Sequence, residues 1–522
     1  MTVAIEQPEI DQIPPPPKGR FLINLIANTL NFGINVLIGL WFTPYLIHHL
    51  GIAAYGLIPL ATTVIAYLGL FTIALNGAVG RYLTIALERQ DTEDANKIFN
   101  TSLVGSIIVI LLLIVPTLLL SGHASWFFTI PAGYQQQFSW LFLCSVGLFL
   151  LTTFSSVFSI SSFCRNRFDL ANTVSIATNL IRIGVVVAMF SLFLPAVWHV
   201  GAGMLVAGFV GVIGSIIVWR YLTPMLRIQP ALFNIGTLRQ LTSTGGWVVV
   251  NQIGTLLYLC IDLIVVNRLI GAEAGGQYGA LLQWSTLLRG IAGTVAGVFA
   301  PTIIAFYAQH DLSGLVQYSQ RAVKMLGLVI ALPIGLICGL SRPLLHAWLG
   351  PEFAALSPLL SLMTIHLCVN LGVLPLFNIQ VATNNVRLPG ILTCVMGAMN
   401  LGLALWLAGP VGWGMYGVAA AGAIMLTAKN LLFTPLYGAH ILGIGHGTFF
   451  RATIPIIVAT LGLTASGWGI ASLFPILSWT ALFGVGAILT CLYLGFTYLI
   501  LLTKEERGAA LRLLAPRLVL HQ

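Results

Sequence analysis

The chain has 522 residues, with only 23 basic and 14 acidic side chains and a mean hydropathy of +0.97. This composition excludes a water-soluble globular protein, because a helix that crosses a bilayer needs about 20 apolar residues and such runs fill the chain. The net charge of +9 does not indicate a nucleic-acid partner, because the basic residues are scattered among loops and do not form one patch.

The N-terminal segment 1–20 is separate from the rest, acidic at first and then rich in proline, with Pro14 to Pro17 in a row. This composition predicts a disordered arm with a polyproline stretch. It does not fit a signal peptide, which needs a basic start, a short apolar core and a small-residue cleavage site.

Long apolar runs follow in close succession, roughly fourteen of them at the length a bilayer requires. They predict an all-α, polytopic membrane protein. The runs lie near 21–47, 52–80, 98–121, 138–162, 171–194, 197–220, 245–270, 275–306, 321–341, 355–383, 389–409, 411–437, 452–474 and 476–502.

Basic residues occupy alternate gaps between these runs, and cytoplasmic loops are the ones that retain Lys and Arg. The other gaps hold Arg342 and little else. Both termini are therefore expected in the cytoplasm. The basic set is Lys18, Arg20, Arg81, Arg89, Lys97, Arg165, Arg167, Arg220, Arg227, Arg239, Arg321, Lys324, Arg387, Arg451, Lys504, Arg507, Arg512 and Arg517.

Signals of metal, cofactor or nucleotide chemistry are weak. The seven cysteines stand singly with no CxxC pair, so neither a zinc site nor a disulfide framework is indicated. A phosphate-binding GxxxxGK[ST] loop is missing. The acidic run 91–94 lies in a mixed-charge loop and is best explained by solvation, and His48–His49 by an interfacial position. We expect no cofactor, no metal and no enzyme activity.

The two halves of the chain resemble each other when the sequence is aligned with itself at one constant offset. Polar and glycine positions match: Asn31 with Asn251, Gly51 with Gly271, Gly77 with Gly297, Asp91 with Asp311, and Arg167 with Arg387; Asn179 meets Asn400 after a shift of one further position. Six spans per unit give two lobes in parallel orientation, an arrangement of transporters with the site between the halves. The predicted units are an arm at 1–20, lobes at 21–240 and 241–440, an extra helix pair at 441–502 and a tail at 503–522.

Four asparagines mark one face of the first span, because Asn24, Asn28, Asn31 and Asn35 recur at the period of a helix. An amide facing lipid would lose water without replacement. The stripe therefore faces either a neighbouring helix, through hydrogen bonds, or a wet cavity that holds sugar hydroxyls. Both alternatives stay open.

Charged residues inside spans are functional candidates, because placing one in a membrane costs at least about 2.5–3.5 kcal/mol. Arg289 and Arg182 lie near the middle of their spans. Lys429 is closer to a span end, where its amine could reach the interface, and Arg268 is interfacial. Asp262 is either a structural partner of an arginine or a proton or cation site.

The sum of these intramembrane charges is positive, which favours an anionic substrate. Guanidinium groups bind a diphosphate well through charge-assisted, often bidentate hydrogen bonds. The predicted substrate-binding set is Arg289, Arg182, Asn24, Asn28, Asn31, Asn35, Asn251 and Lys429, with Asp262 as the ion-coupling candidate.

Four segments together resemble the Wzx-like, O-antigen type polysaccharide flippases of the multidrug/oligosaccharidyl-lipid/polysaccharide exporter superfamily. These segments are loose patterns of Gly, Tyr, Pro and Asp, and the resemblance extends over 21–440. They are NFGINVLIGLWFTPYLIHHLGIAAYG at 31–56, NGAVGRYLTIALERQD at 76–91, IDLIVVNRLIGAEAGGQYG at 261–279 and LLRGIAGTVAGVFAPTIIAFYAQHD at 287–311.

The resemblance implies two six-helix lobes around a cavity lined by spans 1, 2, 7 and 8, and alternating access that carries undecaprenyl-diphosphate-linked glycans. Arg289 and Arg182 match the basic cavity of the family. Expected partners are a lipid-linked oligosaccharide, membrane lipid and polysaccharide polymerase or export machinery. Alternatives are a multidrug/cation antiporter, although spans 1–6 have no acidic residue in their interiors, a lipid II flippase, and a membrane glycan polymerase or ligase, although the outer loops are short.

Overall fold

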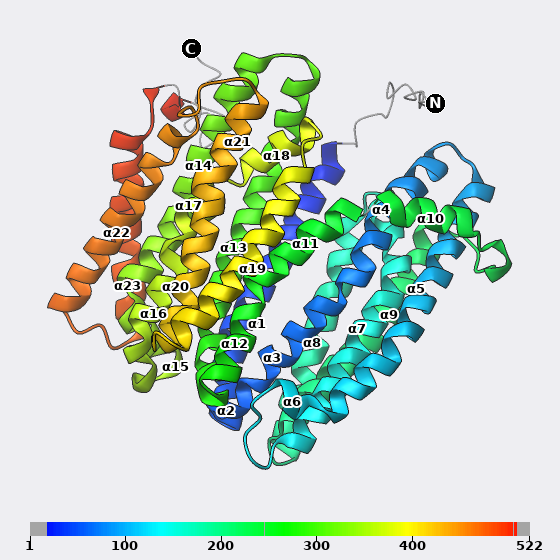
Figure 1. Cartoon of the computed structure of the whole chain (residues 1–522), viewed down its shortest axis with the longest axis horizontal. Helices are drawn as coiled ribbons and strands as arrows, with labels where there is room; N and C mark the ends of the chain where they lie inside the picture. The colour runs from blue at the N-terminus through cyan, green and yellow to red at the C-terminus, as the bar shows by residue number, and fades with distance from the viewer. Residues whose placement is uncertain (1–17, 245, 505, 509–522) are drawn as a thin grey trace.

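A computed structural model describes residues 18–244, 246–504 and 506–508. The predicted proline-rich arm and most of the predicted tail lie outside these residues. Throughout the described residues the chain is helical with no β-strand, and it forms two lobes that converge near α2 (Figure 1). The predicted all-α, polytopic fold class is confirmed.

From Lys18 onward, where the structure describes the chain, the first lobe contains nine helices, and a short linking segment leads to the second lobe. The helices are α1 (Lys18–Leu50), α2 (Ile52–Tyr55), α3 (Leu57–Leu68), α4 (Leu70–Glu88), α5 (Thr92–Gly122), α6 (Ala124–Phe127), α7 (Gln135–Cys164), α8 (Phe168–Leu192) and α9 (Val197–Leu222), followed by η1 (Pro230–Leu232) and α10 (Ile235–Thr244).

The second lobe repeats the plan with more interruptions, and a final helix pair packs on its outside against α14. Its elements are α11 (Gly246–Leu259), α12 (Ile261–Leu269), α13 (Ala272–Ala308), α14 (Leu312–Gly339), α15 (Ser341–Leu349), η2 (Pro351–Leu356), α16 (Ser357–Ile365), α17 (Leu367–Gly372), α18 (Pro375–Ala382), α19 (Arg387–Ala408), α20 (Gly414–Thr427), η3 (Ala428–Phe433) and α21 (Thr434–Ile441). The pair is η4 (Phe450–Ala452), α22 (Ile454–Leu473), α23 (Trp479–Phe496) and η5 (Thr497–Leu501).

Among the described residues, 13 helices are long and apolar enough to cross a membrane, and Ile52–Leu68 is a shorter apolar helix. The predicted second and tenth spans are each broken into pieces. Gly56 and Gly69 separate α2, α3 and α4, and Pro375 begins α18. These breaks follow from residues that weaken or interrupt a helix.

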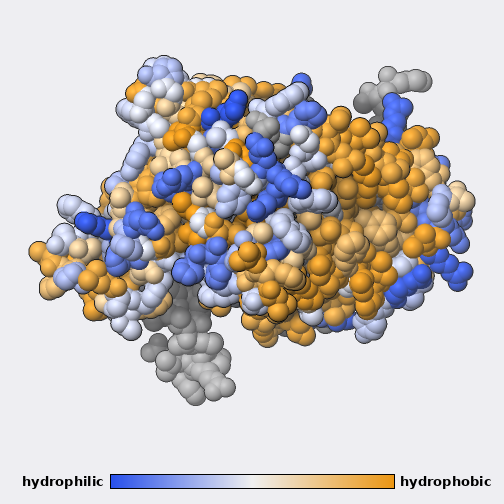
Figure 2. Space-filling view, turned by 90° about the horizontal axis from the view of Figure 1, so that it is seen from below, coloured by the Kyte–Doolittle hydropathy of each residue, from blue (hydrophilic) through white to orange (hydrophobic). Residues whose placement is uncertain are grey.

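The surface agrees with immersion in lipid. Large apolar side chains stand exposed on several outer helices, among them Leu112 at 68% and Leu461 at 52%. Seen from the side of α2, apolar side chains cover broad flanks while polar ones gather over the middle and left of the face (Figure 2). A chain in water would bury these side chains, so lipid is the solvent that fits them.

Two turns recur in both lobes with the same backbone geometry. Gln90 and His310, which match at the offset of the repeat, have φ of 58° and 57°. Each is followed by an aspartate whose carboxylate accepts a hydrogen bond from a backbone N–H of the next helix at 2.9 Å. Asn166 and Asn384, which lie just before the matched Arg167 and Arg387 but are 218 residues apart, also have positive φ, at 51° and 56°. The two lobes thus repeat in local geometry as well as in sequence, while the exact unit boundaries at 240 and 440 stay predictions.

The apolar core shows where the lobes meet. One cluster joins residues of both lobes, including Leu46 and Tyr55 from the first and Tyr278 and Leu345 from the second. A separate cluster lies within the first lobe, between α4, α5, α7 and α9, where Phe99 stacks on Trp219 at 5.4 Å. We call the end where α1, α5, α8 and α14 begin the basic end, and the end with α2, α6 and α15 the α2 end. The separate cluster lies toward the basic end, so the lobes share a core only toward the α2 end.

Close contacts hold the lobes together at the α2 end. A Cβ on Gly56 would lie 2.7 Å from the backbone nitrogen of Gly276, so only glycine allows this backbone approach. The Asn267 side chain accepts from the Thr129 N–H at 2.9 Å and donates to the Thr129 carbonyl at 3.1 Å. These contacts close the α2 end of the molecule between the lobes.

Candidate intramembrane site

The strongest candidate site begins where the seventh span breaks. Cys260 separates α11 from α12, and this break places Asp262 in the first turn of α12. A carboxylate is favourable there, because the unpaired N–H groups and the dipole of a helix N-terminus are positive. The local sequence thus places an acidic side chain within a span, just after a local distortion of the helix.

Two neutral side chains hold the Asp262 carboxylate, which is 7% exposed. It accepts a hydrogen bond from Asn400 of α19 at 3.2 Å and another from Tyr278 of α13 at 3.4 Å. Neither donor carries a charge. The carboxylate is therefore positioned by three helices without an ion pair, which leaves its charge available to a cation or a proton.

Arg289 of α13 lines the same cavity as Asp262, a space of about 360 Å³ bounded by α12, α13, α16 and α20. No hydrogen bond or ion pair joins its guanidinium to any residue that the structure describes. An arginine at this depth is costly unless something compensates its charge, and the Asp262 carboxylate on the same cavity attracts the guanidinium and compensates part of that cost. The arrangement leaves its planar fork of donors free for a bidentate acceptor such as a phosphate.

The broken tenth span adds neutral polar groups to this region. His366 lies between α16 and α17 and lines the cavity, and its Nδ1 is 2.8 Å from the Asn370 Nδ2. Asn370 also donates to Thr427 at 3.2 Å and accepts from Asn430 at 3.3 Å. This network links the cavity wall to the π-helical turn of the twelfth span.

Lys429 lies on that π-helical turn, a type of helix distortion that is frequent at functional sites. Its Nζ is 5.8 Å from the ring centre of Tyr258 and 5.6 Å from that of Phe377, within cation–π range. Because Tyr258 also lines the cavity, Lys429 lies one side chain behind the cavity wall.

The asparagine face of α1 lies against α8 and the turn before it. Asn31 donates to Asn172 at 2.9 Å, Asn172 donates to Asn28 at 2.6 Å, and Asn179 donates to Asn35 at 2.8 Å. These contacts correspond to the helix-packing alternative. A role in binding sugar stays a prediction, which Asn28 fits best because it is exposed.

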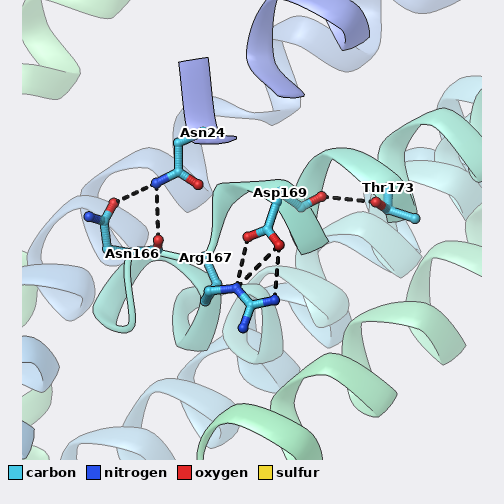
Figure 3. A network of polar contacts seen from close by, with 5 residues as sticks. All are labelled: Asn24, Asn166, Arg167, Asp169 and Thr173. Carbon is cyan, nitrogen blue, oxygen red and sulfur yellow. Dashed lines mark hydrogen bonds and ion pairs between the residues drawn. The ribbon is translucent and has the colours of Figure 1, made fainter. Parts of the chain in front are cut away.

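The row of amide hydrogen bonds along the asparagine face of α1, here called the α1 ladder, ends at the basic end of the molecule, in the network of Figure 3. Asn24 is 8% exposed and donates to both the carbonyl and the side-chain oxygen of Asn166 at 3.0 Å. Next to it Arg167 forms an ion pair with Asp169 at 2.9 Å, and Thr173 donates to the Asp169 carbonyl. This end of α1 is fixed to the α7–α8 turn by neutral amides, while the nearby arginine already has a partner.

Two further candidates lie apart from the Arg289 cavity. Arg182 is on α8 in the first lobe, with a buried Nε that has no hydrogen-bond partner among the described residues. Asn251 is exposed on α11, and its carbonyl accepts from Thr255. The structure thus brings together Asp262 and Arg289, with Lys429 behind them, and leaves the α1 asparagines, Arg182 and Asn251 elsewhere.

Sequence reasoning missed four polar side chains of the site: Tyr278, His366, Asn370 and Asn400. One signal was available for Asn400, which matches Asn179 in the repeat. Another was Pro375, which predicts an interrupted helix just beyond His366 and Asn370. Tyr278 gave no usable signal, because a tyrosine in an apolar run is compatible with ordinary packing.

Two helical lobes with charged groups at broken helices, deep in the membrane-spanning region, define a membrane transporter. The family comparison gives the same class: residues 21–306 match the family described as "Polysaccharide biosynthesis protein", and the chain belongs to this family. It is 35% identical over 497 residues to "Uncharacterized membrane protein EpsK" of Bacillus subtilis, covering 94% of this chain and 98% of that protein. It is 24% identical to "Putative O-antigen transporter" of Shigella flexneri, covering 79% and 97%.

Among solved structures, the lipid II flippase MurJ in an inward closed conformation is similar. It has a TM-score of 0.66 and 16% identity, covering 91% of this chain and 99% of that chain. At this low sequence identity, the similarity shows a shared fold and nothing about the substrate. The predicted relationship to polysaccharide flippases of the multidrug/oligosaccharidyl-lipid/polysaccharide exporter superfamily is confirmed.

Proposed function

We propose that this protein is a flippase that moves a lipid-linked oligosaccharide, carried on undecaprenyl diphosphate, from the cytoplasmic to the outer leaflet of a bacterial cytoplasmic membrane. The observation that carries the proposal is Arg289, which lines a cavity among membrane-spanning helices and makes no hydrogen bond or ion pair with any residue that the structure describes. A diphosphate would compensate the guanidinium charge in a low-dielectric space, and each would lower the cost of placing the other there.

The orientation follows from charge. The basic end carries the Lys and Arg residues of the alternate loops and is proposed to lie in the cytoplasm, with both termini on that side. Because the described residues of the two lobes share a core only toward the α2 end, this proposed orientation would make the structure a state closed toward the outside. Transport would require the Gly56–Gly276 and Asn267–Thr129 contacts to separate.

Asp262 supports a proposed coupling step. Binding of a monovalent cation or a proton would neutralise the carboxylate held by Asn400 and Tyr278, and the charge on Asp262 would in turn alter the field at Arg289 within the same cavity. Loading of this site and binding of the anionic substrate would thus be linked. The glycan is translocated without a change in covalent bonds.

Asp262 also supports the second candidate, a cation-coupled multidrug antiporter. The two candidates differ in what Arg289 should attract, because an unpaired guanidinium favours an anionic substrate and disfavours the organic cations that such antiporters export. The presence of Arg289 and the family membership therefore favour the glycan substrate.

The decisive experiment is glycan export in cells that depend on this protein, with Arg289→Ala, Arg289→Lys and the matched control Arg268→Ala, which removes an exposed arginine at the α2 end of α12. We expect Ala to abolish export at normal protein abundance, Lys to retain part of it and Arg268→Ala to export normally. Normal export by Arg289→Ala, or loss explained by missing protein, would contradict the diphosphate role.

A further inference from the structure

A second cavity lies outside the transport site, where the extra helix pair meets the second lobe at the α2 end. It measures about 490 Å³ and lies between the end of α14, the first turns of α15 and α16, and one face of α22. Small residues bring α14 and α22 together there: a Cβ on Gly467 would lie 3.0 Å from the Gly339 Cα. This backbone contact gives the cavity a rigid wall.

The lining of this cavity combines apolar side chains with serine and threonine hydroxyls and carries one positive charge. Arg342 is exposed, and its guanidinium has no hydrogen bond or ion pair with a described residue. No described lining residue is acidic. The sequence makes this arginine unusual, because the outer gaps between spans otherwise hold almost no basic residue and positive charge is disfavoured on the translocated side.

Hydrogen-bond donors surround Arg342. The first-turn residues of α15 and α16, among them Ser341 and Ser357, line the cavity, and no side chain caps either helix N-terminus. Such N-termini favour anions. Independently, the buried Oγ1 of Thr464 on α22 has no hydrogen-bond partner among the described residues.

The rim of the cavity faces lipid. Trp468 of α22 lines it and is 70% exposed, and Leu473 near the end of the same helix is 77% exposed. Tryptophan favours the interface between headgroups and acyl chains. A ligand can therefore place a charged group in the cavity and apolar chains along α22.

We infer that this cavity binds the phosphate group of an anionic lipid in the outer leaflet, through Arg342, the serine hydroxyls and the two helix N-termini. The ligand can be an anionic phospholipid or a polyprenyl phosphate, since both present a phosphoester next to apolar chains. Zwitterionic lipids bind more weakly, because no carboxylate in the described lining accepts their ammonium group. The site is separate from the Arg289 cavity, and its occupancy is measured without transport.

Native mass spectrometry of the full-length protein in detergent, with added phosphatidylglycerol, tests this inference. We expect wild type to retain one more phosphatidylglycerol molecule than Arg342→Gln. The affinity of Arg342→Gln for this lipid should be roughly tenfold weaker, because the variant loses a charge-assisted hydrogen bond. Arg342→Lys retains part of the binding, and Arg268→Gln is the matched control that removes an arginine elsewhere at the same end.

Competition separates the possible ligands. The inference is supported if undecaprenyl phosphate displaces phosphatidylglycerol and phosphatidylcholine does not. Displacement by inorganic phosphate would contradict the assignment of a lipid as the ligand. Thermal unfolding of each variant controls for misfolding, and Thr464→Val, which keeps volume and charge, is a second variant with expected weaker retention. Equal lipid retention by wild type and both cavity variants overturns the inference.

Discussion

The helix pairs α1–α8 and α11–α19 occupy equivalent places in the two lobes, but different chemistry holds each pair together. Amides connect α1 to α8, along a helix whose other described side chains are mostly exposed before Asn31 and mostly half-buried or buried after it. Glycine packing connects α11 to α19: a Cβ on Gly254 would lie 2.6 Å from the Cys394 backbone nitrogen. Polar contacts between membrane helices contribute only about 0.6 kcal/mol each, whereas close backbone packing is intolerant of displacement. The first lobe therefore has the looser pair and the second the rigid one.

The candidate site around Asp262 is held by α19, a helix of the rigid α11–α19 pair. Asn179 and Asn400 match in the repeat, yet Asn179 donates to Asn35 and Asn400 donates to Asp262. The position equivalent to Asp262 in the first copy of the repeat is Phe42, which belongs to the shared apolar core. At this position the duplicated scaffold has thus kept an apolar packing residue in one copy and placed a carboxylate in the other.

The largest effect should come from breaking the rigid pair. Gly254→Ala places a methyl group against the α19 backbone and should lower the free energy of unfolding by about 1–3 kcal/mol. Gly33→Ala on α1 is the matched control, because no atom lies within 4 Å of its Cβ, and it should be neutral or stabilising by about 0.5–1 kcal/mol. Thermal unfolding in detergent compares them, and equal losses would remove the distinction between the pairs.

The matched asparagines give the next effect. Asn400→Ala leaves the buried Asp262 carboxylate with one donor fewer and should cost about 1–3 kcal/mol together with export. Asn179→Ala should cost about 0.6 kcal/mol and preserve export. Thermal unfolding and glycan export are both measured, and an Asn179→Ala loss as large as that of Asn400→Ala would show that the two positions do the same work.

A smaller, chemical difference is expected along the α1 ladder. In a variant without native cysteines, Asn28→Cys should react with a polar thiol reagent, while Asn24→Cys should be protected because Asn24 is 8% exposed. Leu112→Cys on the lipid-exposed face of α5 controls for reagent that enters lipid. Uniform protection of the four asparagine positions would leave only the helix-packing role.

The smallest effect concerns pH and the tail of the second lobe. Burial raises the pKa of Glu506, but the hydrogen bond from Lys324 at 2.7 Å, the hydrogen bonds from Thr503 and the charge of Lys324 together outweigh it, and the pKa is lowered from its ordinary value. A lowered folded-state pKa means that the stabilisation is complete above the ordinary Glu pKa of about 4.3 and is lost as pH falls through the folded value. Thermal unfolding of the wild type should show this loss of stability between neutral and acidic pH, and the loss should be smaller in Glu506→Gln. If Glu506→Gln has the same pH dependence as the wild type, the Lys324–Glu506 ion pair is not its cause.

Much of the fold could be predicted because lipid imposes strong rules. Apolar run length predicted the spans, and loop charge together with repeat spacing predicted two lobes. The breaks within the second and tenth spans were harder, since they depend on how single Gly and Pro residues are tolerated by neighbouring helices.

The site was only partly predictable. Asp262 and Arg289 stood out because a charge in an apolar run is costly, and the structure places both on one cavity. Tyr278, His366 and Asn370 did not stand out, since neutral polar residues are common in packed helices. The partners of the α1 asparagines depended on which helix lies next to α1, which period alone does not determine.

The Gly56–Gly276 contact has a mechanical consequence for the proposed transport cycle. It lies at one end of long helices: α5 alone has 31 residues, which at 1.5 Å per residue is a rod of about 46 Å. While this contact is still closed, a rotation of the lobes about it by about 10° displaces the far tip of such a rod, at the basic end, by about 8 Å; the contact separates only in the later step that opens the α2 end. A pivot where two backbones touch without side chains thus converts a small angle into an opening wide enough for a sugar.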